Sequence, residues 1–472
     1  MLRVTTARRS SSRPVIAHAH APAPLIPRLG SWALRACIFA ATAGLIIGAP
    51  LLRDWRSNDA ARSRLTLAST RSAAESAARS REQALFFEQR LMHNPDDVDL
   101  LNRLSVLYLQ RLRESGAFSD LELAVRTARR SLVIVPAVRN VPGLTSRAMA
   151  EFASHEFSSA RDDARTLTSL DGSGTPFALL GDAYAELGDY GAAERAYAHL
   201  RQRNGDMDEN VATRRARLAA LHGDNAAAQD ALSQALALEV GRSSPSPERI
   251  AWYSWQLGDA AFFTGDYATA RTKYDDALRV YPGYFRALAS LGRLDAARGD
   301  YPRAEDSYGA AISALPDPTF VAELGDVYAL AGDKVSAERE YALVDFIGHL
   351  SRINGVMYNR QLVMFDADHG RNVISAYRSA KQEYRIRHDI LGADALAWSA
   401  YKAGKIAEAR TAIRDALRLG TNDPRLFYHA GLIARASGQT RMARAFIERA
   451  LRESPQFDPY QARVARSALA SL

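Results

Sequence analysis

A Gly-Asp pair recurs along the chain at a nearly constant interval, and this spacing constrains the fold more than any other feature. The pairs begin at Gly188, Gly223, Gly265, Gly299 and Gly332. Successive pairs are 35, 42, 34 and 33 residues apart, and the segments between them are rich in Ala, Leu and Arg, without the alternation typical of strands. A helical period of about 34 residues indicates stacked helix pairs, each too small to bury its apolar face alone. The sequence therefore predicts an all-α solenoid of antiparallel helix pairs.

The same side-chain types also recur within each interval. The clearest unit, 285–318, has small and aromatic residues at regular positions, and units 174–207, 251–284 and 424–457 repeat much of this pattern. In unit 285–318 the pattern consists of Leu288, Leu291, Gly292, Gly299, Tyr301, Ala304, Tyr308, Ala311 and Pro316. The arrangement resembles the tetratricopeptide repeat (TPR) family of bacterial type. This resemblance implies a superhelical solenoid that binds other proteins.

The glycine inside the first helix of a unit has a physical explanation. Gly292 and its equivalents each cost about 1 kcal/mol of helix propensity, which is offset only if the second helix approaches closely at that point. Tyr308 is predicted to fill the gap between layers, and Pro316 to stop the second helix. The Gly-Asp pair ends one helix with a residue tolerant of positive φ and gives the next helix an N-cap oxygen.

Five segments follow from these patterns. Residues 1–30 are rich in Arg, Ser, Ala and Pro and are predicted to form a disordered basic tail. Residues 31–52 are a candidate transmembrane anchor or uncleaved signal, and 53–94 a linker with a juxtamembrane helix. The solenoid is predicted to span 95–459 in about nine to ten units, and residues 460–472 to form a C-terminal capping helix.

The segment 31–52 contains an uncharged run of 17 residues that begins at Ala36, at the short end of what spans a bilayer as a helix. Trp32 and Arg35 occupy the positions of an interfacial aromatic residue and a snorkelling cation. An uncleaved anchor is favoured because Pro50 follows the obvious signal-cleavage site. Secretion after signal cleavage, or a buried helix of a soluble protein, stay open as alternatives.

The distribution of arginine predicts how such an anchor is oriented. Six arginines and no acid precede the apolar run, whereas the residues just after it carry mixed charges. This bias predicts a cytoplasmic N-terminus. The solenoid would then face the periplasm or exterior from a single-pass anchor in a bacterial cytoplasmic membrane.

Net charge and cysteine content exclude several classes of partner and site. The formal net charge is +8, and most of this excess is ascribed to the N-terminal tail, so nucleic acid is not expected as a partner. Cys37 is the only cysteine. Neither a disulfide framework nor a cysteine metal site is therefore possible within one chain.

Motifs for catalysis or metal binding are missing from the sequence. No GxxxxGKS/T, HExxH or GxSxG motif occurs. The best candidate constellation is Asp366, Asp368 and His369, followed by His388, but a calcium loop would need a carboxylate where Tyr377 stands. These residues are interpreted as a polar turn between helices. The chain is predicted not to be an enzyme and to need no metal, cofactor or small-molecule substrate.

The TPR resemblance also implies which residues contact a partner, because the first helix of each unit lines the concave groove of a TPR superhelix. The matching positions give an aromatic and charged candidate groove of Trp252, Trp255, Asp259, Phe262, Arg286, Arg293 and Asp326. Exposed tryptophan beside charged residues is typical of interaction hot spots. Trp252 or Trp255 could instead pack beneath the longer connection 238–250.

These observations predict a membrane-anchored scaffold or adaptor that binds a protein or peptide through its concave groove. Two alternatives stay open. One is an accessory or assembly factor for a membrane or envelope complex, whose contacts would lie on the convex side. The other is a cytoplasmic TPR regulator with a buried N-terminal helix.

Overall fold

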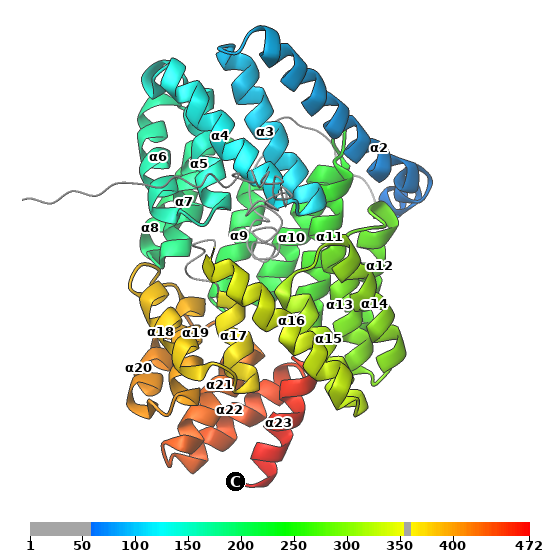
Figure 1. Ribbon diagram of the computed structural model, residues 1–472, viewed down its shortest axis with the longest axis vertical. Helices are drawn as coiled ribbons and strands as arrows, with labels where there is room; N and C mark the ends of the chain where they lie inside the picture. The colour runs from blue at the N-terminus through cyan, green and yellow to red at the C-terminus, as the bar shows by residue number, and fades with distance from the viewer. Residues whose placement is uncertain (1–57, 354–359) are drawn as a thin grey trace, which may run out of the picture. The chain divides into compact units, whose positions relative to one another are not determined.

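The computed structural model describes residues 58–353 and 360–472, and within these ranges the chain is helical with no strand (Figure 1). The helices of the first part are α2 (Asn58–His93), α3 (Val98–Ser115), α4 (Phe118–Ile134), the 3-10 helix η1 (Ala137–Arg139), α5 (Val141–Ala153), α6 (Phe157–Leu170), α7 (Thr175–Leu187), α8 (Tyr190–Asn204), α9 (Glu209–Leu221), α10 (Asn225–Val240), α11 (Pro247–Phe263) and α12 (Tyr267–Val280). Those of the second part are α13 (Phe285–Ala297), α14 (Tyr301–Ala314), α15 (Pro318–Ala331), α16 (Lys334–Ile353), α17 (Arg360–His369), α18 (Val373–Tyr384), α19 (Ile390–Lys402), α20 (Ile406–Ala416), α21 (Pro424–Ala436), α22 (Thr440–Glu453) and α23 (Pro459–Ala470).

The helices pair in chain order. Helices such as α3 and α4, α11 and α12, or α21 and α22 pack against each other across a short turn and form antiparallel hairpins. Odd-numbered helices also contact the next odd-numbered helix, as α5 contacts α7 and α13 contacts α15. The odd-numbered helices therefore form the inner layer of a solenoid, and the even-numbered helices its outer layer. This arrangement confirms the all-α solenoid predicted from the repeat spacing.

The predicted membrane segment cannot be located in this structure. No described helix is long and apolar enough to cross a membrane. The predicted tail 1–30 and anchor 31–52 lie outside the described residues. Helix α2 covers most of the predicted linker 53–94, and α23 lies where the capping helix of 460–472 is predicted.

Within a helix pair, a glycine of the inner helix lies directly against a tyrosine of the outer helix. A Cβ atom added to Gly292 would lie 2.6 Å from the Tyr308 ring, and Tyr308 itself is almost fully buried. Three further pairs show the same contact: Gly181/Tyr197, Gly258/Tyr274 and Gly325/Tyr341. The absence of a side chain on the glycine lets the two helices approach, and the ring then fills the space between them.

The Gly-Asp turns have the predicted geometry. Gly265 has φ of 79°, in the left-handed region where an L side chain is strained. Asp266 begins α12 as its N-cap, because its carboxylate accepts a hydrogen bond of 3.0 Å from the backbone N–H of Thr269. Two adjacent residues thus end one helix and start the next.

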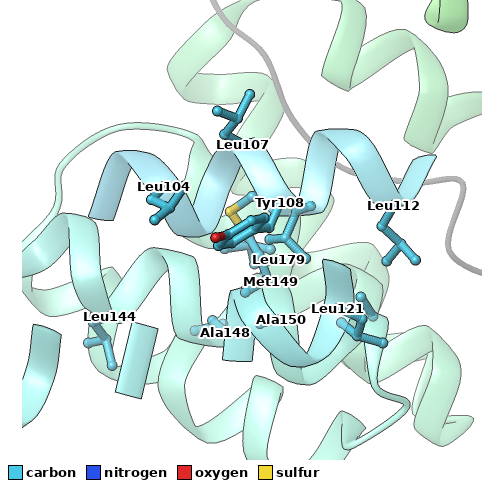
Figure 2. Packing of buried hydrophobic residues seen from close by; sticks show 14 of the residues in the cluster. Leu104, Leu107, Tyr108, Leu112, Leu121, Leu144, Ala148, Met149, Ala150 and Leu179 are labelled. Carbon is cyan, nitrogen blue, oxygen red and sulfur yellow. The ribbon is translucent and has the colours of Figure 1, made fainter. Parts of the chain in front are cut away.

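The N-terminal pairs, in which the repeat pattern is weak, share a core of larger apolar side chains. Leu104 and Tyr108 of α3, Leu121 of α4 and Met149 of α5 belong to one buried cluster (Figure 2). All four side chains are buried. In these pairs the burial of large apolar side chains, and not a glycine–tyrosine contact, stabilises the packing of one helix against the next.

The solenoid also contacts itself further along the chain. Several hydrogen bonds join residues that are 187 to 201 positions apart in the sequence. The backbone N–H of His388 donates to the carbonyl of Leu187 at 3.1 Å, and the hydroxyl of Ser454 donates to the carbonyl of Phe262 at 3.0 Å. Successive superhelical turns therefore touch, which the repeat spacing does not predict.

The glycine–tyrosine contact predicts the effects of three substitutions. Tyr308→Ala is expected to lower the free energy of unfolding by about 3–5 kcal/mol, because it leaves a cavity between two layers. Gly292→Ala should cost about 1–3 kcal/mol, because its methyl group meets the ring. Gly309→Ala is the matched control: a Cβ atom there meets open space on a helix, so this variant should gain up to about 1 kcal/mol.

Urea denaturation followed by circular dichroism measures all three variants. A loss below about 1 kcal/mol for Tyr308→Ala, within the range of ordinary substitutions, would contradict the role given to this ring.

Candidate partner-binding surface

Among the ion pairs that join successive inner helices are four that begin at an aspartate, which we call the inner links. Each runs from an aspartate on one inner helix to a cation on the next: Asp182–Arg214 (2.6 Å), Asp259–Arg293 (2.6 Å), Asp326–His369 (2.8 Å) and Asp394–His429 (2.8 Å). In the first three, the aspartate also accepts a hydrogen bond from the tyrosine of its own unit. One carboxylate thus connects three helices.

Two of the seven residues predicted to line the groove are core residues instead. Trp252 is 7% exposed and Phe262 is 0% exposed, and each belongs to a hydrophobic cluster. Packing between helices takes up both side chains, which corrects their assignment to a partner-facing surface. Arg286 is also buried, with its guanidinium over the rings of Trp255 and Phe285.

Trp255, Asp259 and Arg293 are half-buried and come together around Ser290. The indole N–H of Trp255 donates to the Ser290 hydroxyl at 3.0 Å, and that hydroxyl donates to Asp259 at 3.1 Å. The guanidinium of Arg293 donates to the same oxygen of Asp259 at 2.6 Å. Asp326 is half-buried as well but belongs to a different inner link.

Two residues outside the predicted groove extend this group. The guanidinium carbon of Arg293 lies 5.1 Å from the centre of the Phe263 ring, and that of Arg425 lies 4.4 Å from the same ring. The side chain of Arg425 is 48% exposed. Sequence reasoning missed Arg425 because it belongs to a later unit and reaches Phe263 only where two superhelical turns meet. We call Trp255, Asp259, Phe263, Ser290, Arg293 and Arg425 the Arg293 cluster.

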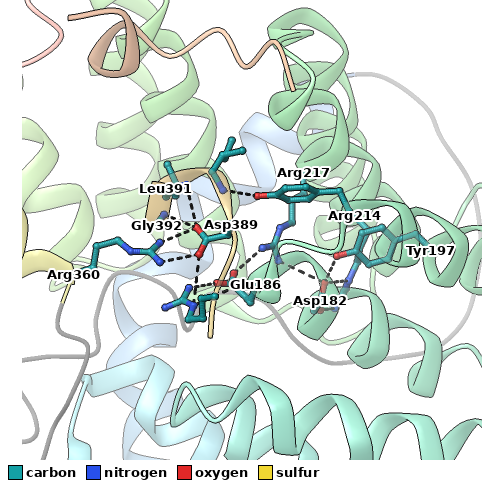
Figure 3. Close-up of polar contacts among 12 residues, drawn as sticks. Asp182, Glu186, Tyr197, Arg214, Arg217, Arg360, Asp389, Leu391 and Gly392 are labelled. Carbon is teal, nitrogen blue, oxygen red and sulfur yellow. Dashed lines mark hydrogen bonds and ion pairs between the residues drawn. The ribbon is translucent and has the colours of Figure 1, made fainter. Parts of the chain in front are cut away.

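A network of ion pairs joins the end of α7 to the next superhelical turn (Figure 3). The carboxylate of Glu186 accepts a hydrogen bond of 2.6 Å from Arg387. Arg387 also donates to Glu383 at 3.1 Å, and Arg360 donates to Asp389 at 2.8 Å. Glu383, Arg387 and Asp389 are all buried. The network therefore holds two turns together, and its charges are satisfied within the chain.

The charge state of Glu186 reflects this arrangement. Burial alone would raise the pKa of its carboxyl group, but the neighbouring guanidinium groups of Arg217 and Arg387 lower that pKa to about 2. Glu186 thus stays ionised at any ordinary pH, and it acts as a fixed counter-charge for both arginines.

Sequence profiles of the tetratricopeptide repeat family match residues 176–207, 256–317, 290–344 and 395–456. The first three ranges carry the helix pairs with the glycine–tyrosine contact described above, whereas in 395–456 Gly431 lies against Ile447. The chain is a tetratricopeptide repeat protein. No match is found among curated proteins.

Three solved structures are similar to this TPR protein. A tetratricopeptide repeat protein from Parabacteroides merdae is 16% identical, and the match covers 56% of this chain and 97% of the other with a TM-score of 0.31. Human IFIT1, solved as a dimer with PPP-AAAA, is 13% identical. That match covers 78% of this chain and 94% of the IFIT1 chain, with a TM-score of 0.40. The protein pilF of Pseudomonas aeruginosa is 17% identical. That match covers 47% of this chain and 99% of pilF, with a TM-score of 0.25.

The TPR array also gathers carboxyl groups where α23 meets the inner helices α13 and α15. Burial raises the pKa of Glu323 and of Asp458 to about 7. Burial opposes the charge of His369 too, but its hydrogen bond to Asp326 raises the pKa of the imidazole to about 9. Arg293 opposes the effect of burial on the pKa of Glu323, and His369 opposes it on the pKa of Asp458.

The candidate metal constellation of Asp366, Asp368, His369 and His388 does not converge. Asp368 accepts a hydrogen bond of 2.8 Å from the indole N–H of Trp398, and the other members bond to different neighbours. Within residues 58–353 and 360–472, no three side chains of His, Cys, Asp or Glu are placed to hold a metal ion.

The ion-pair network predicts a large effect of removing Arg387. Arg387→Ala is expected to lower the free energy of unfolding by about 3–5 kcal/mol, because Glu186 and Glu383 lose a buried counter-charge. The double variant Arg387→Ala/Glu186→Gln should lose less than the sum of the single losses. The exposed pair of Arg103 with Asp99 supplies the control, since Arg103→Ala should change stability by about 0.5 kcal/mol at most.

Urea denaturation at several pH values tests this assignment. Because the folded pKa of Glu186 is lowered, its contribution is present above about pH 4.5, the ordinary glutamate range, and is lost as the pH falls toward 2. Equal losses in Arg387→Ala and Arg103→Ala would show that the network does not hold the turns together.

Proposed function

We propose that this TPR protein is a membrane-anchored scaffold that binds a protein partner. The repeats carry the first part of this proposal, since TPR arrays generally act as non-catalytic surfaces for other proteins. The uncharged run within 31–52 and the arginines before it support the anchor. On this proposal the solenoid faces the periplasm or the exterior of a bacterial cytoplasmic membrane.

The Arg293 cluster is the contact surface that the inner helices support best. It combines an aromatic ring, a half-buried arginine and the half-exposed Arg425, which are the residue types enriched at binding hot spots. The inner link to Asp259 and the hydrogen bond to Ser290 hold Arg293 and Trp255 in place before a partner arrives. A surface organised in advance loses less side-chain entropy on binding.

Partner capture tests this surface. Trp255→Ala and Arg425→Ala are each expected to weaken capture of a specific partner from solubilised membranes about tenfold or more, the loss of one hot-spot contact. Capture is measured by quantitative mass spectrometry against the intact chain, with circular dichroism as the folding check. Arg126→Ala, an exposed position on the outer helix α4, is the matched control. Unchanged capture by both Trp255→Ala and Arg425→Ala would reject the Arg293 cluster as the contact surface.

Reporter fusions test the anchor independently of any partner. Alkaline phosphatase fused after residue 60 is expected to be active, and a green fluorescent protein at the same position dark, because the anchor exports whatever follows it. Removal of residues 31–52 should reverse both signals. An active fusion released into the soluble fraction would indicate signal cleavage, and a fluorescent fusion would favour a cytoplasmic regulator.

An assembly factor that uses its outer side is the second candidate function. It is favoured by the inner links, because the aspartates at positions predicted to face a partner already bind cations and tyrosines of the same chain. Contacts would then concentrate on the even-numbered helices. Cross-linking of the intact chain distinguishes the two candidates by the layer in which the linked residues lie.

A further inference from the structure

The charges of this chain are unequally divided along its length. Residues 175–370 contain 19 basic and 28 acidic side chains, a net charge of 19 − 28 = −9, whereas residues 371–472 contain 18 basic and 9 acidic ones, a net charge of 18 − 9 = +9. The second range is described completely by the structure. The excess of positive charge therefore belongs to the folded C-terminal units as well as to the N-terminal tail.

Within 371–472 the positive charges lie at the surface and the negative ones do not. Fourteen of the lysine and arginine side chains are exposed, but Glu448 is the only exposed acid in this range. Ion pairs and hydrogen bonds within the chain use the other acids. Seven of the exposed arginines lie on the outer helices α18, α20 and α22, and we call these the basic face: Arg378, Arg410, Arg414, Arg441, Arg444, Arg449 and Arg452.

The three outer helices form one continuous surface. Lys381 of α18 pairs with Glu408 of α20 at 2.9 Å. Phe446 of α22 packs against the hydrophobic cluster that contains Ile413 of α20. Figure 1 shows α18, α20 and α22 in the orange part of the solenoid. The arginines of the basic face are therefore neighbours in space, although they come from different repeats.

The basic face carries unbalanced charge in the isolated chain. Arg410 and Arg414 are four residues apart on α20, so they repel each other on the same side of the helix. Neither forms an ion pair with any side chain of the described ranges, and the same holds for Arg378, Arg441 and Arg452. An anionic partner would remove this repulsion, which favours binding.

The composition of the face selects among anionic partners. Thirteen of the fourteen exposed cations in 371–472 are arginines, whose planar guanidinium pairs with a carboxylate through two hydrogen bonds. No Phe, Tyr or Trp in this range is exposed. Single-stranded nucleic acid and membrane interfaces are both recognised with the help of exposed aromatic rings. The absence of such rings within 371–472 favours a protein segment rich in Asp and Glu.

We propose that the outer face of α18, α20 and α22 binds an acidic segment of a partner protein. This inference rests on the proposed scaffold function and names the chemistry of one partner. It also adds a second surface to the Arg293 cluster, which lies on the inner helices. A scaffold with contacts on both layers can hold two partners at the same time.

Binding of a fluorescein-labelled Glu-rich peptide to the intact chain tests the proposal, with the Gln counterpart of the peptide as the neutral probe. Arg410→Glu/Arg414→Glu is expected to weaken binding of the Glu-rich peptide about tenfold or more, and to flatten the dependence of affinity on salt. Arg126→Glu/Arg195→Glu makes the same change of charge on exposed positions of α4 and α8, so it is the matched control and should bind nearly as tightly as the natural chain.

A photo-cross-linker at the exposed Thr411, between the two arginines, supplies the second measurement in the full-length chain within its own membranes. The cross-linked peptide, identified by mass spectrometry, is expected to have a clear excess of Asp and Glu, and Arg410→Glu/Arg414→Glu should abolish the cross-link. Equal affinity of both charge-reversal variants for the peptide, or tight binding only to phosphatidylglycerol vesicles or to DNA, would overturn the acidic-protein assignment. If the natural chain captures no protein at all, the scaffold function itself fails, which is a different outcome.

Discussion

The close approach of a glycine on one helix to a tyrosine on its partner helix is the contact on which the rest of this structure depends. It brings the helices of a pair together at the same point in several units, because a Cβ atom at Gly181, Gly258, Gly292 or Gly325 would collide with the ring. The geometry of each pair then fixes how the next pair stacks. An interior packed this tightly deforms little, so small displacements between units are suppressed and distant units meet in a defined register.

Polar contacts extend this order from one unit to the next and from one turn to the next. The inner links place a carboxylate between helices, where the tyrosine hydroxyl and a cation of the following unit satisfy it. The network around Glu186 and Arg387 does the same between turns. Buried ion pairs add little net stability, because desolvation offsets their attraction, but an incorrect register would leave charges unpaired at a high cost. Their consequence is a single arrangement of the turns. They also occupy side chains that a groove-binding partner would otherwise contact.

The distribution of charge then separates the surfaces available to partners. The middle units, residues 175–370, carry a net excess of acid, whereas the outer layer of the C-terminal units exposes arginines with hardly any acid beside them. Whole-chain net charge conceals this division, since the excess acid of 175–370 cancels the excess base of 371–472. Protein binding by the inner Arg293 cluster and by the basic face are compatible activities of one scaffold.

The sequence by itself determined the helix pairs, their turns and the glycine–tyrosine contact, because these depend on residues close together in the chain that repeat with a fixed period. It also predicted that Trp255, Asp259 and Arg293 belong to one surface, since they lie in adjacent units. Only the tertiary structure decided that Trp252 and Phe262 are buried, that Arg425 reaches Phe263, and that Arg387 pairs with Glu186. The last two contacts join different superhelical turns. Their positions depend on the small rotation from each unit to the next, summed over several units, and no local pattern of residues encodes that sum.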